Sequence, residues 1–207
     1  MIISFLRKYI FIAVPKTGTH AVRQALREQM GPDDWEQVGL FVHKAFPVPE
    51  LAAIRHGHLT LREVRPFLNP DDFDSFYKFG FVRNPFDRFV SFCSFMTRKD
   101  GAFDRDPQAV MRYFLFEKPP HERIHFQPQH IFFEDDQGRI IANQVGRVEE
   151  MQSSYDEACR RIGVASRPPD TVNASRRGGY RDYYTAELRD AVAKLYARDL
   201  DLFGYQF

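Results

Sequence analysis

The most distinct pattern in the chain is a short apolar run followed by a turn and a helical repeat. The run, Tyr9-Ile-Phe-Ile-Ala-Val14, is β-branched and almost entirely apolar, which is typical of a strand buried on both faces of a sheet. It ends at Pro15-Lys-Thr-Gly18. Apolar residues then recur at helical spacing from Ala21 to Met30, where Gly31-Pro32 ends the repeat. This stretch predicts a central strand, a loop and a helix.

A second stretch of the same kind begins at Phe76. The segment Phe76-Tyr-Lys-Phe-Gly-Phe-Val82 predicts another buried strand, and Arg83-Asn84-Pro85 predicts a turn. Asn84 is suited to cap the following helix, and Pro85 is suited to its first position. The inner face of this predicted helix is apolar and consists of Phe86, Phe89, Val90, Cys93 and Met96.

The later part of the chain continues the alternation of strands and helices. The predicted elements are a helix over 107–117, one or two short strands over 138–148, a helix over 149–162 closed by Gly163, and a helix over 185–200 capped by Thr185. Alternating strands and helices predict an α/β fold with a parallel sheet covered by helices on both faces. A length of 207 residues fits one domain, spanning 1–207.

Composition excludes several classes of protein. Lys and Arg total 29 against 28 Asp and Glu, so the net charge of +1 argues against a dedicated nucleic-acid binder and makes any anion site local. Cys93 and Cys159 are too few for a disulfide framework and fall at apolar helical positions, which predicts buried free thiols in a reducing cytosol. The run 9–14 is far too short to span a bilayer, so we expect a soluble, cytoplasmic protein without a transmembrane segment.

The first loop has the chemistry of a phosphate site. A buried strand that ends in a glycine-containing turn and opens a helix directs several backbone N–H groups, and the positive end of the helix dipole, at one point. The candidate anion-binding residues are Lys16, Thr17, Gly18, Thr19 and His20. Lys16 precedes the glycine, so the usual nucleoside-triphosphatase loop is absent. An ordinary strand-to-helix turn with an exposed lysine is the alternative.

The second strand ends in a different residue type. A nucleoside triphosphatase often places a magnesium-holding aspartate at such a position, whereas this chain has Arg83 there, which binds an anion and not a metal. Ser91, eight residues later, shares that ligand only if the loop folds Arg83 back over the helix.

These residues resemble a known family. Pro15-Lys-Thr-Gly-Thr19 resembles the 5′-phosphosulfate loop of sulfotransferases that use 3′-phosphoadenosine 5′-phosphosulfate (PAPS), and Phe81-Val-Arg-Asn-Pro-Phe-Asp-Arg-Phe-Val-Ser91 resembles their 3′-phosphate motif. The similarity is strongest to the carbohydrate-type branch and continues through Gly146-Arg-Val-Glu149, Asn173-Ala-Ser175 and Tyr196…Asp199…Phe203-Gly-Tyr205. It implies the P-loop-like sulfotransferase fold, with Arg83 and Ser91 at the 3′-phosphate and 16–19 at the 5′ side.

Sulfuryl transfer to an alcohol needs a base for the acceptor proton and a cation for the leaving phosphate. Histidine suits the first role because its ordinary pKa lies near neutrality, and Lys16 suits the second. His56-Gly-His58 lies between the two phosphate motifs, just before a possible capping box of Thr60 and Glu63. This triplet resembles the catalytic segment of uronyl and heparan 2-O-sulfotransferases, which implies that His58 is the base. A solvated surface turn and a His-x-His metal site are the alternatives, and we expect no metal cofactor.

Other polar residues have less specific patterns. Arg176-Arg177-Gly-Gly-Tyr180 is suited to close over an adenosine bisphosphate or an anionic acceptor, which makes Arg176 a further candidate for donor binding, although a solvated turn fits equally well. Gln127 and Gln129 are candidates for an acceptor cleft. Arg88 is expected to pack or to form a structural ion pair.

The expected reaction is therefore sulfuryl transfer from PAPS to a hydroxyl of a carbohydrate, glycolipid or small-molecule acceptor. Two alternatives stay open. A kinase or triphosphatase with an atypical phosphate loop would bind ATP with magnesium, and a non-catalytic module would bind the nucleotide without turnover.

Overall fold

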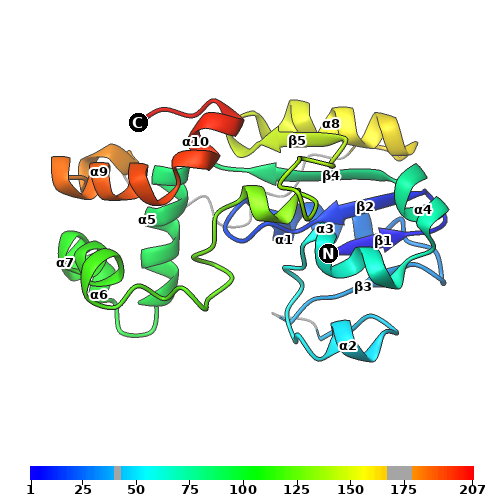
Figure 1. The fold of residues 1–207 in the computed structure, drawn as a ribbon, viewed down its shortest axis with the longest axis horizontal. Coiled ribbons are helices and arrows are strands. Elements are labelled where there is room, and N and C mark those ends of the chain that lie inside the picture. Colours follow the sequence, from blue (N-terminus) through cyan, green and yellow to red (C-terminus); the bar gives the residue numbers. More distant parts are fainter. Residues whose placement is uncertain (40–42, 167–178) are drawn as a thin grey trace. The chain divides into compact units, whose positions relative to one another are not determined.

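The computed structural model describes residues 1–39, 43–166 and 179–207 (Figure 1). Their contacts divide the chain into two compact units. The sheet unit comprises the described parts of Met1–Val82 and Ile131–Val172, and the helical unit comprises those of Arg83–His130 and Asn173–Phe207. The single domain over 1–207 stays a prediction.

The described part of the sheet unit contains a five-stranded sheet in the order β3-β1-β2-β4-β5. Its strands are β1 (Ile2–Ser4), β2 (Tyr9–Ile12), β3 (Trp35–Glu36), β4 (Tyr77–Val82) and β5 (Gln144–Arg147). The predicted α/β fold is confirmed, and β2, β4 and β5 are parallel as expected. The prediction of an entirely parallel sheet is wrong at β1 and β3, because β1 runs antiparallel to both β2 and β3. Only a short turn separates β1 from β2, which allows a hairpin but no crossover.

The helices of the sheet unit are short except for two. They are α1 (Thr19–Arg27), α2 (Pro49–Ala52), α3 (Leu61–Val64), α4 (Pro70–Ser75) and α8 (Met151–Ile162), with 3₁₀ turns at Arg65–Phe67 and Val148–Glu150. A further 3₁₀ turn, His130–Phe132, contains the point at which the chain returns from the helical unit to the sheet unit. Gly163 closes α8 in the left-handed conformation, as predicted (φ 68°). Thr60 and Glu63 form the predicted capping box at the start of α3.

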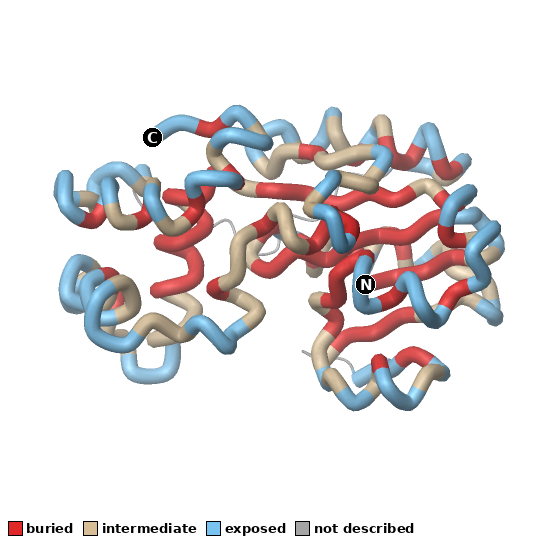
Figure 2. The backbone as a smooth tube through the Cα atoms, in the orientation of Figure 1, coloured by how far each residue is buried: buried red, intermediate tan, exposed pale blue. Residues whose placement is uncertain are grey.

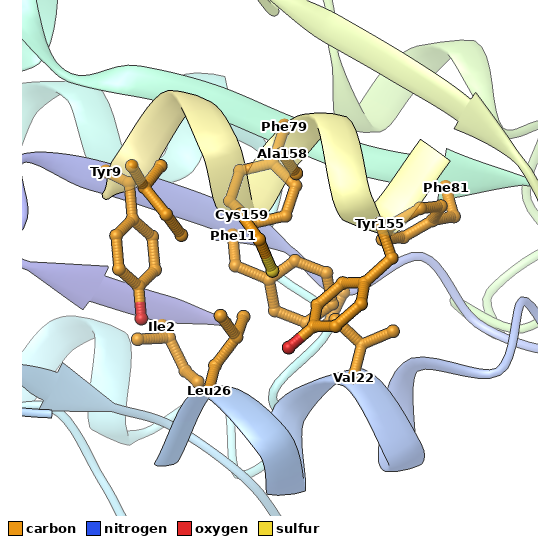
Figure 3. Packing of buried hydrophobic residues seen from close by; sticks show 12 residues of the cluster. Ile2, Tyr9, Phe11, Val22, Leu26, Phe79, Phe81, Tyr155, Ala158 and Cys159 are labelled. Carbon is orange, nitrogen blue, oxygen red and sulfur yellow. The ribbon is translucent and has the colours of Figure 1, made fainter. Parts of the chain in front are cut away.

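The hydrophobic core of the sheet unit packs against α1, the helix that directly follows the first loop. Val22 and Leu26 of α1 point toward Tyr155 and Cys159 of α8, and both helices pack against Phe11 and its neighbours on the strands (Figure 3). The strands β1, β2 and β4 are buried along nearly their whole length (Figure 2). The loop that joins β2 to α1 is therefore anchored at both ends.

The helical unit contains α5 (Pro85–Met96), α6 (Ala102–Arg105), α7 (Pro107–Arg112), α9 (Ala186–Leu195) and α10 (Ala197–Phe203), a π-helical turn at Tyr113–Glu117 and a 3₁₀ turn at Tyr180–Tyr183. Thr185 caps α9 as predicted. The single helix expected over 185–200 is wrong, since the chain leaves helical geometry at Tyr196 (φ −113°, ψ 28°) and begins α10. Cys93 and Cys159 are buried and unoxidised, which confirms the predicted thiols.

None of the described helices is long and apolar enough to cross a membrane.

Candidate active site

The loop after β2 lies at the carboxyl edge of the parallel strands. It runs from Val14 to Thr19, and its backbone contains two left-handed residues, Lys16 (φ 69°) and Gly18 (φ 71°). Thr17 lies between them with an ordinary φ, so the sign of φ alternates along the loop. Such alternation turns successive N–H groups toward one point and makes a concave anion-binding nest.

The helix that follows this loop begins without a cap. Gly18 occupies the N-cap position, no described side chain caps the helix, and its first turn contains no acidic residue. The first N–H groups of a helix have no partner within the helix, and they carry the positive end of its dipole. This start of α1 is therefore complementary to a phosphate or sulfate group.

Two of the candidate loop residues, Thr17 and His20, have surroundings that limit what they can offer an anion. The hydroxyl of Thr17 donates to the carbonyl of Val14 (3.0 Å) and Thr17 is fully buried, so this hydroxyl stabilises the turn and its hydrogen is not offered to an anion. The pKa of His20 is lowered by burial and then by Arg23 and Arg27, so its ring is neutral at pH 7. An anion at this loop would therefore meet no positive charge on His20.

His58 lies against the strand that leads into this loop. Its Nδ1 is 2.6 Å from the carbonyl oxygen of Ala13, the residue directly before Val14. A carbonyl oxygen only accepts hydrogen bonds, so Nδ1 carries the hydrogen, and the basic lone pair of the neutral ring lies on Nε2. A general base needs such a basic nitrogen, and His58 lies beside the first loop, because Ala13 directly precedes it.

The turn that carries His58 is fixed by backbone contacts. Gln37, which directly follows β3, donates to the carbonyl oxygens of Leu51 (2.7 Å) and His56 (3.0 Å). The backbone of Gly57 is so close to Gln37 that a Cβ at Gly57 would lie 2.1 Å from the Gln37 carbonyl oxygen. The N–H of His58 donates to Nδ1 of His56 (3.3 Å), and burial lowers the pKa of His56. His56 therefore stays neutral and supports the turn.

Arg83 and Ser91 belong to the helical unit. Arg83 follows Val82 of β4 directly, and its Nε and Nη2 both contact one carboxylate oxygen of Asp87 at 2.6 Å. Asn84 caps α5 by accepting from the N–H of Phe86, and Pro85 begins the helix, as predicted. Ser91 lies one turn after Asp87 on the same helix face. The loop thus folds Arg83 back over α5. From the sequence, this fold is required for Arg83 and Ser91 to be able to share a ligand.

Gln129 has a different role from the one expected. It is fully buried, its side-chain oxygen accepts from the N–H of Arg83, and its side-chain nitrogen donates to the carbonyl of Arg83, both at 2.9 Å. The hypothesis that Gln129 lines an acceptor cleft is therefore wrong. Arg88 is 1% exposed and donates to the backbone carbonyls of His125 and Gln127, consistent with the expected structural role.

Some expectations concern parts of the chain that the structure leaves out. Asn173-Ala-Ser175 and Arg176 lie outside the described residues, as does most of the arginine-glycine segment that follows. Among the described residues, no group of three or more His, Cys, Asp or Glu side chains is arranged to hold a metal ion. The structure groups the first loop with His58 in the sheet unit and Arg83 with Ser91 in the helical unit. Their convergence on one nucleotide stays a prediction.

Sequence reasoning missed the supports of these residues. Gln37, Asp87, Gln129 and Asp199 hold the candidate site residues or their neighbours. The ion pair of Asp87 could have been predicted from the sequence, because Asp87 lies four residues after Arg83 near the start of a predicted helix. The contacts of Gln129 and Asp199 could not have been predicted in this way, because their partners are remote in the sequence.

The sheet unit thus combines a parallel strand, a glycine turn in the left-handed conformation and a helix without a described cap, which is the typical arrangement of an anion-binding loop in α/β proteins, here with a histidine beside it. The family model of the sulfotransferase family matches residues 3–206, so the chain belongs to that family and is an enzyme of the sulfuryl-transfer class. The resemblance drawn from the two phosphate motifs is thereby confirmed at the level of the family. Comparisons with curated proteins and with solved structures give no match.

Proposed function

We propose that this protein transfers the sulfuryl group of PAPS to a hydroxyl of a carbohydrate, glycolipid or small-molecule acceptor. The 5′-phosphosulfate binds Lys16, the backbone of Thr17 and Gly18, Thr19 and His20. Arg83 and Ser91 bind the 3′-phosphate, and Arg176 is a further donor contact. The single observation that supports the proposal is the contact of His58 Nδ1 with the carbonyl oxygen of Ala13 (2.6 Å), since Ala13 directly precedes the first loop and the contact leaves the basic lone pair of the neutral ring on Nε2.

The chemistry follows from these groups. His58 Nε2 takes the hydroxyl proton of the acceptor while the acceptor oxygen forms a bond to sulfur. The bond between sulfur and the 5′-phosphate oxygen breaks, which leaves a sulfate ester and adenosine 3′,5′-bisphosphate. Charge grows on the leaving phosphate in this step, and the Lys16 ammonium and the N–H groups of the loop stabilise it. The proposal assigns no step to a metal ion.

The test separates catalysis from donor binding. We expect His58→Ala to lower the turnover number by roughly a hundredfold to ten-thousandfold, because a positioned general base contributes that much. Its affinity for adenosine 3′,5′-bisphosphate, measured by calorimetry, should be unchanged. His43→Ala is the matched control, since His43 is exposed and lies outside the site. Full turnover in a folded His58→Ala protein, measured with labelled PAPS and a broad acceptor panel, would contradict the role of His58.

The two other functions give different results in the same assays. An atypical kinase or triphosphatase binds ATP with magnesium better than it binds the bisphosphate without metal. A non-catalytic module binds the bisphosphate but transfers no sulfate to any acceptor of the panel. Either result for the unmodified protein would overturn the proposed function.

A further inference from the structure

The segment His125–His130 of the helical unit contains two buried residues, Phe126 and Gln129, and several of its backbone groups accept hydrogen bonds from buried side chains or donate hydrogen bonds to them. Arg88 donates to the carbonyls of His125 (3.3 Å) and Gln127 (2.5 Å). The hydroxyl of Tyr196 donates a hydrogen bond to the carbonyl oxygen of Phe126 (2.8 Å). Both side chains are almost fully buried, at 1% and 2% exposure. These contacts fix the segment from α5 on one side and from the junction of α9 and α10 on the other.

Asp199 holds the end of the same segment. This carboxylate is fully buried in the first turn of α10, and its two oxygens accept from the N–H groups of Gln129 (2.7 Å) and His130 (2.8 Å). A buried carboxylate is costly unless its oxygens are satisfied, and charge-assisted hydrogen bonds of this length are among the stronger ones in proteins. The backbone at Gln129 is therefore rigidly placed.

The side chain of Gln129 in turn fixes the backbone of Arg83. Its primary amide pairs with both backbone groups of Arg83, one bond in each direction and both at 2.9 Å. Among side chains, only a primary amide presents one donor and one acceptor in the geometry that matches a peptide group in this way. A glutamate would lose the bond to the Arg83 carbonyl and would set two acceptors against each other.

We propose that Gln129, held by Asp199, is a positioning residue that sets how well the enzyme recognises the 3′-phosphate of its donor. Arg83 has a long, flexible side chain, and its backbone starts directly after a strand. With the backbone fixed by Gln129 and the guanidinium already held over α5 by Asp87, the 3′-phosphate meets a preorganised cation. This inference rests on the proposed function, because it assumes that Arg83 binds that phosphate.

The test compares two nucleotides that differ only in the 3′-phosphate. The readout is the ratio of the dissociation constants for adenosine 5′-monophosphate and adenosine 3′,5′-bisphosphate, measured by calorimetry on the full chain. We expect Gln129→Glu to lower this ratio by about tenfold, which is 1.4 kcal/mol, while the affinity for the 5′-monophosphate stays the same. A general loss of structure would weaken the binding of both nucleotides and leave the ratio of their dissociation constants unchanged.

Gln127→Glu is the matched control. It is the same substitution two residues away in the same segment, and the side chain of Gln127 contacts the carbonyl of His121 and not Arg83. Its ratio should equal that of the unmodified protein. Asp199→Asn should lower the ratio in the same direction as Gln129→Glu but by less, since it acts through Gln129.

Further variants keep the proposal falsifiable. If Gln129→Glu does not fold, Gln129→Met removes both bonds without burying a charge and should lower the ratio by a similar factor. In an Arg83→Ala background, Gln129→Glu should leave the ratio as it is, because the residue that it positions is gone. An unchanged ratio in folded Gln129→Glu or Gln129→Met overturns the inference. If the unmodified protein binds both nucleotides equally well, the proposed function itself fails.

Discussion

The two turns that follow β2 and β4 occupy equivalent places after neighbouring parallel strands, yet they are built in opposite ways. The first turn is made of backbone: left-handed Lys16 and Gly18 shape it, and α1 begins without a described side-chain cap. The second turn is made of side chains: Asn84 caps α5, and Arg83 contacts Asp87.

Under the proposed function, this difference gives two kinds of anion contact from similar elements. In the first turn no described side chain caps α1, so anion binding there would depend on the backbone conformation that aims its N–H groups. In the second turn the helix start is satisfied internally, and the positive charge comes from one guanidinium. Substitutions should therefore act through backbone strain at the first turn and through charge at the second.

The largest effect should follow from removing the charge of the second turn. We expect Arg83→Ala to weaken binding of adenosine 3′,5′-bisphosphate by about tenfold to a hundredfold, since a hydrogen bond to a charged group contributes about 1.5–3 kcal/mol. Calorimetry measures this change. Arg98→Ala, which removes an exposed arginine beyond the end of α5, should bind normally. Equal affinities for Arg83→Ala and the unmodified protein would show that the second turn is not a phosphate site.

The next effect concerns the backbone of the first turn. Gly18→Ala should lower the free energy of unfolding by about 1–2 kcal/mol, because a side chain at φ 71° is strained. It should also weaken binding of adenosine 5′-monophosphate. Gly163→Ala is the control, since Gly163 has φ 68° in the same unit and its Cβ would meet no atom within 4 Å. Urea unfolding should show similar losses of unfolding free energy for both variants. Weaker binding of adenosine 5′-monophosphate by Gly163→Ala as well would contradict the specific role of the first turn.

A smaller effect should follow from removing the cap of the second turn. Asn84→Ala should lower the free energy of unfolding by about 1 kcal/mol, because the N–H of Phe86 loses its acceptor. Thr185→Ala removes the cap of α9 in the same unit and should cost a similar amount. Only Asn84→Ala should also reduce bisphosphate affinity, since Asn84 adjoins Arg83. Unchanged stability of Asn84→Ala in urea would show that the second turn is not closed by this side chain.

The smallest effect is a pH dependence that belongs to the first turn. Burial, with Arg23 and Arg27, lowers the pKa of His20 below its ordinary value of 6.5. The unfolded chain then takes up a proton at a higher pH than the folded protein does, so stability falls as the pH drops below about 6.5. Thermal melting between pH 7.5 and 5.5 should show a shallower slope for His20→Gln than for His43→Gln. Identical slopes would exclude the contribution of His20.

Local patterns in the sequence predicted most of the fold that carries the site. The strands β2 and β4, the helices α1 and α5, the Asn84 cap and the capping box of Thr60 and Glu63 all depend on residues that are close in the chain. The hairpin between β1 and β2 was missed because three residues are too few to show a strand period.

The supporting contacts were beyond the reach of the sequence because they are not local. Gln129 meets Arg83 across 46 positions, and Asp199 meets Gln129 across 70. From the sequence Gln129 was a candidate for lining an acceptor cleft, and its burial against Arg83 follows only from tertiary packing. The tautomer of His58 likewise depends on Ala13, which is 45 positions away.

The close approach of Gly57 to Gln37 limits how this enzyme can be re-engineered. No residue with a β-carbon fits between the two histidines, because the nearest carbonyl oxygen would lie 2.1 Å away. We therefore expect random libraries over 56–58 to return mostly glycine at the middle position, since any other residue requires the Gln37 backbone to shift, and attempts to broaden acceptor choice should diversify other segments.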